Sequence, residues 1–141
     1  MSSYDPAAGG WRAMPNAALP SGIGIPWSRR VEGVWHYGLM TDDDHGNPNG
    51  FVHGGVLMAF ADHGLSLLAW EAAERTLCTT IQLNTHFLDA IRPGEFIALR
   101  GEVTRQTRGL VFVRGVIGVL GRQDERDVGV VDGIWRVLRA R

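Results

Sequence analysis

Apolar and polar side chains alternate along the second half of the chain. The segment 81–87 places Ile81, Leu83 and Phe87 in one phase, with mainly polar side chains between them. A period of two is typical of a half-buried β-strand. Three further strand-like runs follow after short polar breaks, at residues 96–106, 110–120 and 128–138. Because short connections favour antiparallel neighbours, this half of the chain predicts an antiparallel sheet.

The first half contains one convincing helix pattern. Residues 56–75 hold no proline and many strong helix formers, and a strand-like run at 31–40 precedes them. The order of strand, helix and four strands predicts an α+β domain in which a curved antiparallel sheet wraps around one long central helix. Residues 1–30 are rich in Gly and Pro without a sustained period. We therefore predict an N-terminal arm at 1–30 and the folded domain at 31–141.

A stripe of small residues runs along the predicted helix. Projection at 100° per residue separates the large apolar side chains from this stripe, and Asp62 lies in its middle. The other members of the stripe are Gly55, Ala59, Ser66, Ala69 and Ala73. A carboxylate is costly to bury unpaired, so Asp62 is exposed, paired or functional. The helix pattern alone leaves a structural and a functional role equally open.

The helix begins at a glycine pair, Gly54-Gly55. Free N–H groups and the positive end of the helix dipole gather there, and glycines leave room for a ligand oxygen. Such a turn can hold a developing oxyanion, although an ordinary Gly-rich helix entry has the same pattern. Seven residues separate Gly55 from Asp62, about 10 Å along the axis, whereas a base and an oxyanion donor both need to lie within about 3 Å of the reacting group. If the two groups cooperate, they must come from different subunits, and a two-fold dimer would form two equivalent sites.

Composition excludes several classes of protein. All 14 basic residues are arginine, which excludes lysine-dependent Schiff-base chemistry and a Walker-type phosphate loop. A formal charge of −1 without a basic cluster makes nucleic acid an unexpected partner. No run approaches the roughly 20 apolar residues of a membrane span, and no export signal is visible. With Cys78 as the single cysteine, a cytoplasmic protein is expected.

The stretch Asn47–Gly55, followed by Ala61-Asp62, resembles the hotdog-fold thioesterases of the phenylacetyl-CoA thioesterase-like branch, within the 4-hydroxybenzoyl-CoA thioesterase superfamily. The resemblance covers about residues 31 to 139. It implies a hotdog fold and hydrolysis of an acyl-CoA thioester to the free acid and CoA. It also implies no metal or organic cofactor, since coenzyme A is part of the substrate. Sites in this branch lie at dimer interfaces, and the resemblance implies a homodimer or a dimer of dimers.

The resemblance also implies roles for individual residues. Asp62 would activate water as a general base or attack the thioester itself as a nucleophile. A backbone amide at Gly54 or Gly55 would polarise the thioester carbonyl. Asn47 and His53 match the family's Asn and His, which would position the carbonyl or the attacking water and brace the turn.

Further substrate contacts are predicted around this centre. Ser66 replaces a glycine that is frequent in the family and could add a hydrogen bond near the carboxylate, while Met58 and Phe87 could line an apolar acyl pocket. Arginines near strand ends could meet the CoA phosphates or be solvated surface charges: Arg92, Arg105 and Arg108. The sequence does not indicate which acyl group is bound.

Other chemistries fit the sequence less well. The histidines lack metal-binding spacing, and no G-x-S-x-G motif is present. A hotdog dehydratase would bring a histidine and a carboxylate to the substrate's carbons, and a non-catalytic acyl-CoA sensor would not need Asp62. The combination of the His53-Gly-Gly turn with Asp62 favours hydrolysis, and both alternatives stay open.

Overall fold

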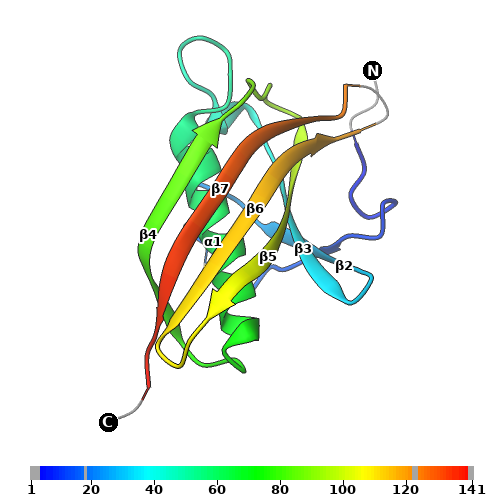
Figure 1. Cartoon of the computed structure of the whole chain (residues 1–141). Coiled ribbons are helices and arrows are strands. Elements are labelled where there is room, and N and C mark those ends of the chain that lie inside the picture. The colour runs from blue at the N-terminus through cyan, green and yellow to red at the C-terminus, as the bar shows by residue number, and fades with distance from the viewer. Residues whose placement is uncertain (1–3, 18, 122–123, 140–141) are drawn as a thin grey trace.

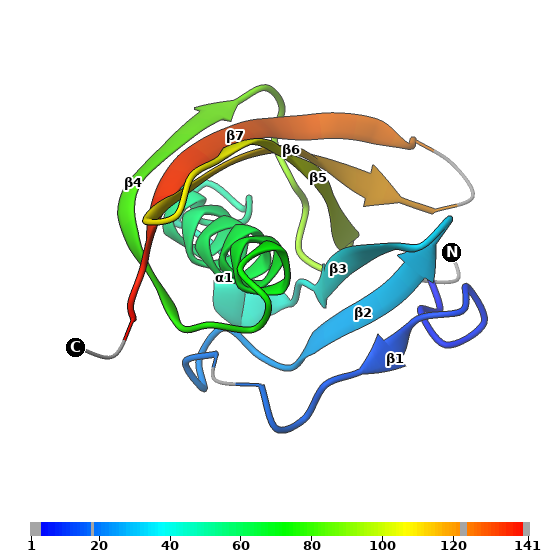
Figure 2. The ribbon, with the colours of Figure 1, turned by 60° about the horizontal axis from the view of Figure 1, so that its bottom comes forward.

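The chain folds as a curved antiparallel sheet around one long helix (Figures 1 and 2). The computed structural model describes residues 4–17, 19–121 and 124–139. The helix is α1 (Gly54–Ala72), and the strand order in the seven-stranded sheet is β1-β2-β3-β5-β6-β7-β4. The strands are β1 (Arg12–Ala13), β2 (Pro26–Val31), β3 (Val34–Met40), β4 (Cys78–Phe87), β5 (Phe96–Gln106), β6 (Leu110–Leu120) and β7 (Arg126–Val137), and a short 3-10 helix, η1, spans Asp43–His45. The predicted hotdog arrangement is confirmed.

The helix packs one face against the concave side of the sheet. Leu57, Phe60, Leu65 and Leu68 are buried on that face and meet alternate side chains of the strands. Gly64 brings the helix close to β5, because a Cβ at this position would lie 2.3 Å from a Leu99 methyl carbon. The opposite face keeps Asp62 and Ser66 half-buried. The middle of the predicted small-residue stripe therefore lies at the border of the core.

Strand β4 forms one edge of the sheet. It pairs with β7 on one side, and no strand of the described residues pairs with its other side. Figure 1 shows that β4 runs antiparallel to α1 and ends beside the start of the helix. One exposed strand edge thus borders the helix face that carries Asp62.

The N-terminal segment differs from its prediction. Its pattern predicts an arm without regular structure, yet β1 and β2 lie within residues 1–30 or at their border, and β2 pairs with β3 over six residue pairs. Glu32 and Gly33 have φ values of 50° and 80°, which is the geometry of a tight two-residue hairpin turn. Trp11 is buried against Phe96 on the outer side of the sheet. The segment is an integral part of the sheet, and the predicted boundary at residue 30 falls inside β2.

None of the helices in the described residues has the length and hydrophobicity needed to cross a membrane.

Candidate active site

Asp62 projects from the middle of α1 towards β4. Its Oδ1 accepts a hydrogen bond of 2.6 Å from the Thr80 hydroxyl. No other partner of this carboxylate occurs among the described residues, and no arginine there forms an ion pair with it. The carboxylate is therefore oriented by a neutral donor without being neutralised. This arrangement leaves Oδ2 free to accept a proton from water or to attack an electrophile.

Thr80 is the site residue that the sequence analysis missed. The alternating pattern begins at Ile81, whereas β4 begins at Cys78, and a register shift between Thr80 and Gln82 interrupts the alternation. Thr80 also lies 18 positions after Asp62 in the chain, so no helical spacing connects the two residues. A polar, β-branched run leading into a predicted strand was the available signal.

The glycine turn is shaped by His53. His53 is the N-cap of α1, and its Nδ1 accepts the Gly55 N–H at 2.9 Å. Since Nδ1 is the acceptor, the neutral imidazole carries its proton on Nε2. The first residue of a helix has no acceptor within the helix, and no described residue accepts the Gly54 N–H. Of the two predicted amides, Gly55 is engaged within the protein and Gly54 is available.

Gly54 also lies directly against Phe87. A Cβ at Gly54 would be 3.2 Å from the Phe87 ring, so any larger residue would have to displace that ring. Phe87 is the last residue of β4 and is 54% exposed, and Met58, one turn after Gly54, is 40% exposed. These two predicted lining residues form open apolar surface beside the Gly54 amide.

Asn47 is held by its own loop. Its Oδ1 accepts the N–H groups of Asn49 at 2.9 Å and Phe51 at 3.2 Å. Its backbone N–H also donates to the Phe51 carbonyl at 2.7 Å. Because the side-chain oxygen is used internally, Nδ2 is left as a donor in the loop that leads to His53.

Ser66 has a packing role that the sequence did not indicate. Its Oγ accepts a hydrogen bond of 2.8 Å from the indole N–H of Trp135, which is fully buried in the core. Buried indole N–H groups need an acceptor. In the described residues Ser66 bonds the core through Trp135, and no hydrogen bond joins its hydroxyl to the Asp62 carboxylate.

Ser66→Ala should destabilise the protein. The change removes the acceptor of a buried indole N–H, and an unsatisfied buried donor costs about 1–3 kcal/mol of unfolding free energy. Chemical denaturation of the variant measures this loss. Ser66→Thr, which keeps a hydroxyl, is the matched control, and equal stability of Ser66→Ala and wild type would contradict the role.

The histidine next to Asp62 remains neutral at physiological pH. Burial lowers the pKa of His63, and the charge of Asp62 opposes this effect without reversing it. The buried Nε2 of His63 has no hydrogen-bond partner among the described residues. His63 thus adds no positive charge beside the carboxylate.

The predicted CoA-binding arginines do not gather within one chain. Arg92 precedes β5, is 67% exposed and forms an ion pair with Asp124. Arg105 and Arg108 lie at the other end of β5, whose 11 residues span roughly 35 Å. A single chain therefore brings Arg105 and Arg108 together but leaves Arg92 at the opposite end.

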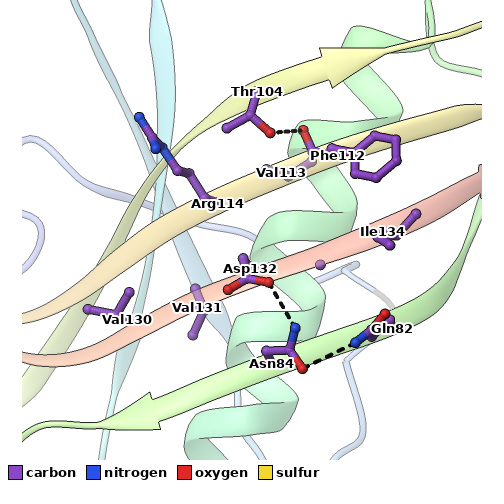
Figure 3. A pocket seen from close by; sticks show the side chains of 11 residues that line it. Gln82, Asn84, Thr104, Phe112, Val113, Arg114, Val130, Val131, Asp132 and Ile134 are labelled. Atoms are coloured by element: carbon purple, nitrogen blue, oxygen red, sulfur yellow. Dashed lines mark hydrogen bonds between the residues drawn. The ribbon is translucent and has the colours of Figure 1, made fainter.

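One hollow of the isolated chain lies away from the proposed site. This hollow of about 450 Å³ occupies the outer face of the sheet, and Figure 3 shows that three of its polar side chains, Gln82, Asn84 and Asp132, are joined by hydrogen bonds. Asn84 donates to Asp132 at 2.9 Å, and Gln82 donates to Asn84 at 3.4 Å. None of the predicted site residues lines this hollow. No group of three or more metal-ligating side chains occurs in the described parts of the chain.

Comparison with known proteins bears on the family and the fold of the chain. The sequence model of the thioesterase superfamily matches residues 49–119 of the 141-residue chain. No curated protein matches the sequence. The fold is similar to that of a Bacillus halodurans protein crystallised with CoA, at a TM-score of 0.70 and 22% identity, covering 81% of this chain and 74% of that chain.

Two further solved structures are similar. A Ralstonia eutropha JMP134 protein described as phenylacetic acid degradation-related has a TM-score of 0.68 and 26% identity, over 78% of this chain and 83% of that chain. A hexameric thioesterase of Yersinia pestis has a TM-score of 0.67 and 16% identity, over 72% and 84% of the respective chains. The residues matched by the superfamily model include the His53–Gly55 turn and Asp62, and the chain belongs to the thioesterase superfamily.

Proposed function

We propose that the protein hydrolyses an acyl-coenzyme A thioester to the free acid and CoA. The observation that carries this proposal is the Asp62 carboxylate, which Thr80 orients and which forms no ion pair with any arginine of the described residues. The available Gly54 amide supplies the second requirement, a donor for the thioester oxygen. The CoA bound to the similar Bacillus halodurans protein supports the substrate class.

Two routes use this carboxylate. As a base, Asp62 takes a proton from water while the water oxygen bonds to the carbonyl carbon, and the C–S bond then breaks to release CoA as a thiolate that is protonated. As a nucleophile, Asp62 displaces CoA to form an anhydride, which water then hydrolyses. In both routes the negative charge develops on the carbonyl oxygen, where the Gly54 N–H would donate.

The proposed site is shared between two subunits. Eight residues separate Gly54 from Asp62, about 12 Å along the helix, so the two groups of one chain cannot act on one carbonyl. Strand β4 contacts both groups of its own chain: its residue Thr80 bonds Asp62, and its residue Phe87 packs on Gly54. Two β4 edges paired antiparallel about the Leu83-Asn84 peptide would place Thr80 of one chain opposite Phe87 of the partner. That pairing would bring each Asp62 towards the partner's Gly54.

The same pairing would regroup the arginines. The two helices would run antiparallel in this dimer. The C-terminal end of the partner's β5, which carries Arg105, would therefore extend past the N-terminus of this chain's α1. Gln106 at that end donates to the Ala72 carbonyl at the helix C-terminus, which fixes the strand end to the helix end. We therefore propose that Arg105 and Arg108 of one chain, with Arg92 of the other, serve the phosphates of one CoA.

A panel of acyl-CoA esters tests the proposed function. Thiol release should be measured for arylacetyl, short-chain and medium-chain esters, and turnover of at least one class is expected. Specific binding without turnover across the panel would favour an acyl-CoA sensor. Hydration of an enoyl-CoA without thiol release would favour a dehydratase.

Thr80→Val should impair catalysis more than substrate binding. The variant keeps the shape of the side chain but loses the donor that orients Asp62. A lost hydrogen bond of about 1.4 kcal/mol corresponds to about a tenfold lower kcat. Steady-state kinetics with Thr80→Ser as the control measures this effect, and a kcat of Thr80→Val equal to that of wild type would rule out the orienting role.

A further inference from the structure

Among the described residues outside the proposed site, Arg126 at the start of β7 has the side chain with the most hydrogen bonds. Its guanidinium is 17% exposed and donates to both carboxylate oxygens of Glu95, at 3.1 and 2.9 Å. It also donates to the Ala90 carbonyl at 2.7 Å and to the Asp89 carboxylate at 3.1 Å. Glu95, Ala90 and Asp89 lie between β4 and β5, whereas a fourth acceptor, Asp124, precedes β7 and accepts from Arg126 on its carbonyl at 3.0 Å and on its carboxylate at 3.4 Å. Arg126 therefore fastens this connection, residues 88–95, to β7.

The Arg126–Glu95 pair is charged at neutral pH. Burial alone would raise the pKa of Glu95, but hydrogen bonds from Arg126 and the Arg92 amide, together with their charges, lower it below its ordinary value. The hydrogen bond with Glu95 in turn raises the pKa of Arg126. The pair is bidentate and mostly shielded from water, unlike the Arg114–Glu102 pair on the outer face, whose side chains are 66% and 61% exposed.

The fastened connection holds the loop that carries the glycine turn. At the start of that loop, Thr41 donates its N–H to the Glu95 carbonyl at 3.1 Å and accepts the Gly94 N–H at 3.0 Å. At its end, Val52 donates to the Ile91 carbonyl at 2.8 Å. His53 and Gly54 follow directly. Both ends of loop 41–53 are thus bonded to the connection that Arg126 fixes.

We propose that Arg126 is a positioning residue that sets the place of the Gly54 amide through residues 88–95. This inference rests on the proposed hydrolysis, in which that amide meets the thioester oxygen. Arg126 does not touch the site itself, and its effect passes through Ala90, Glu95 and the Val52–Ile91 hydrogen bond. A displacement of about 1 Å in a reacting geometry can cost on the order of 10²-fold in rate.

The test combines hydrogen exchange with kinetics on the full chain. Arg126→Gln should speed amide exchange in residues 47–55 and lower kcat on the order of 10²-fold, with KM changed far less. Arg126→Lys, which keeps the charge but not the bidentate geometry, should lie between Arg126→Gln and wild type. Arg114→Gln removes an exposed ion pair remote from the loop and should leave exchange and kcat as in wild type.

The exchange readout is independent of activity. If the wild type hydrolyses no acyl-CoA, the proposed function fails, while exchange still tests whether Arg126 holds the turn. Unchanged exchange at residues 47–55 in Arg126→Gln overturns the inference, as does faster exchange with unchanged kcat. Should Arg126→Gln not fold, Glu95→Gln replaces it, since it weakens the same pair but keeps the bond to Ala90, and the same outcomes decide.

Discussion

Replacement of Asp62 by alanine or asparagine is expected to reduce thiol release on the order of 10²- to 10⁴-fold, the range that general acid–base catalysis contributes. In both proposed routes the carboxylate is the group that takes a proton from water or forms the anhydride. Asn keeps the shape of the side chain and can still accept a hydrogen bond from the Thr80 hydroxyl. Asp62→Asn therefore removes the negative charge while it keeps the packing. Steady-state assays on an ester that the wild type hydrolyses measure the loss.

A matched carboxylate serves as the control for this prediction. Asp132 on the outer face of the sheet accepts one side-chain hydrogen bond, from Asn84, as Asp62 does from Thr80. Asp132→Asn should therefore retain wild-type turnover. If a folded Asp62→Asn variant turned over as fast as Asp132→Asn, the role assigned to Asp62 would be wrong, and its bond to Thr80 would be a structural contact alone.

Two of the strands were predictable to the residue, whereas the others were predicted with shifted ends or missed. The predicted runs 96–106 and 110–120 coincide with β5 and β6, because each is a stretch rich in apolar residues that short polar or glycine-containing breaks bound. β2 was missed because its sequence, PWSRRV, has no apolar phase, and its strand geometry comes from pairing with β3. The Glu32-Gly33 turn was the local signal, since glycine there has positive φ.

The candidate site was predictable as far as helix geometry reaches. The position of Asp62 on the small-residue stripe and its distance from the glycine turn follow from the 3.6-residue period. The Thr80 contact depends on how β4 lies across α1, and the engagement of Gly55 depends on a side-chain rotamer of His53. Neither can be derived from spacing. The separation of Arg92 from Arg105 likewise depends on the course of β5.

A site shared between subunits has a consequence that a site within one chain does not. Asp62→Ala lacks the carboxylate but keeps the turn, and Gly54→Val keeps the carboxylate but blocks the turn, since even a Cβ there crowds the Phe87 ring at 3.2 Å. Each variant alone should be nearly inactive. Co-expressed at equal levels, they should regain about one quarter of wild-type turnover, because half of the dimers are mixed and each mixed dimer has one intact site of two.

The recovered activity distinguishes the two geometries directly. If Asp62 and Gly54 acted within one chain, every chain in the mixture would carry a defect, and co-expression would restore nothing. The expected recovery of about one quarter of wild-type turnover is the same if the dimers assemble into larger oligomers, because each site is formed by one pair of chains. Co-expression of two differently tagged Asp62→Ala chains is the control and should stay inactive. A mixture of Asp62→Ala and Gly54→Val that is no more active than this control would contradict the shared site while leaving the role of Asp62 intact.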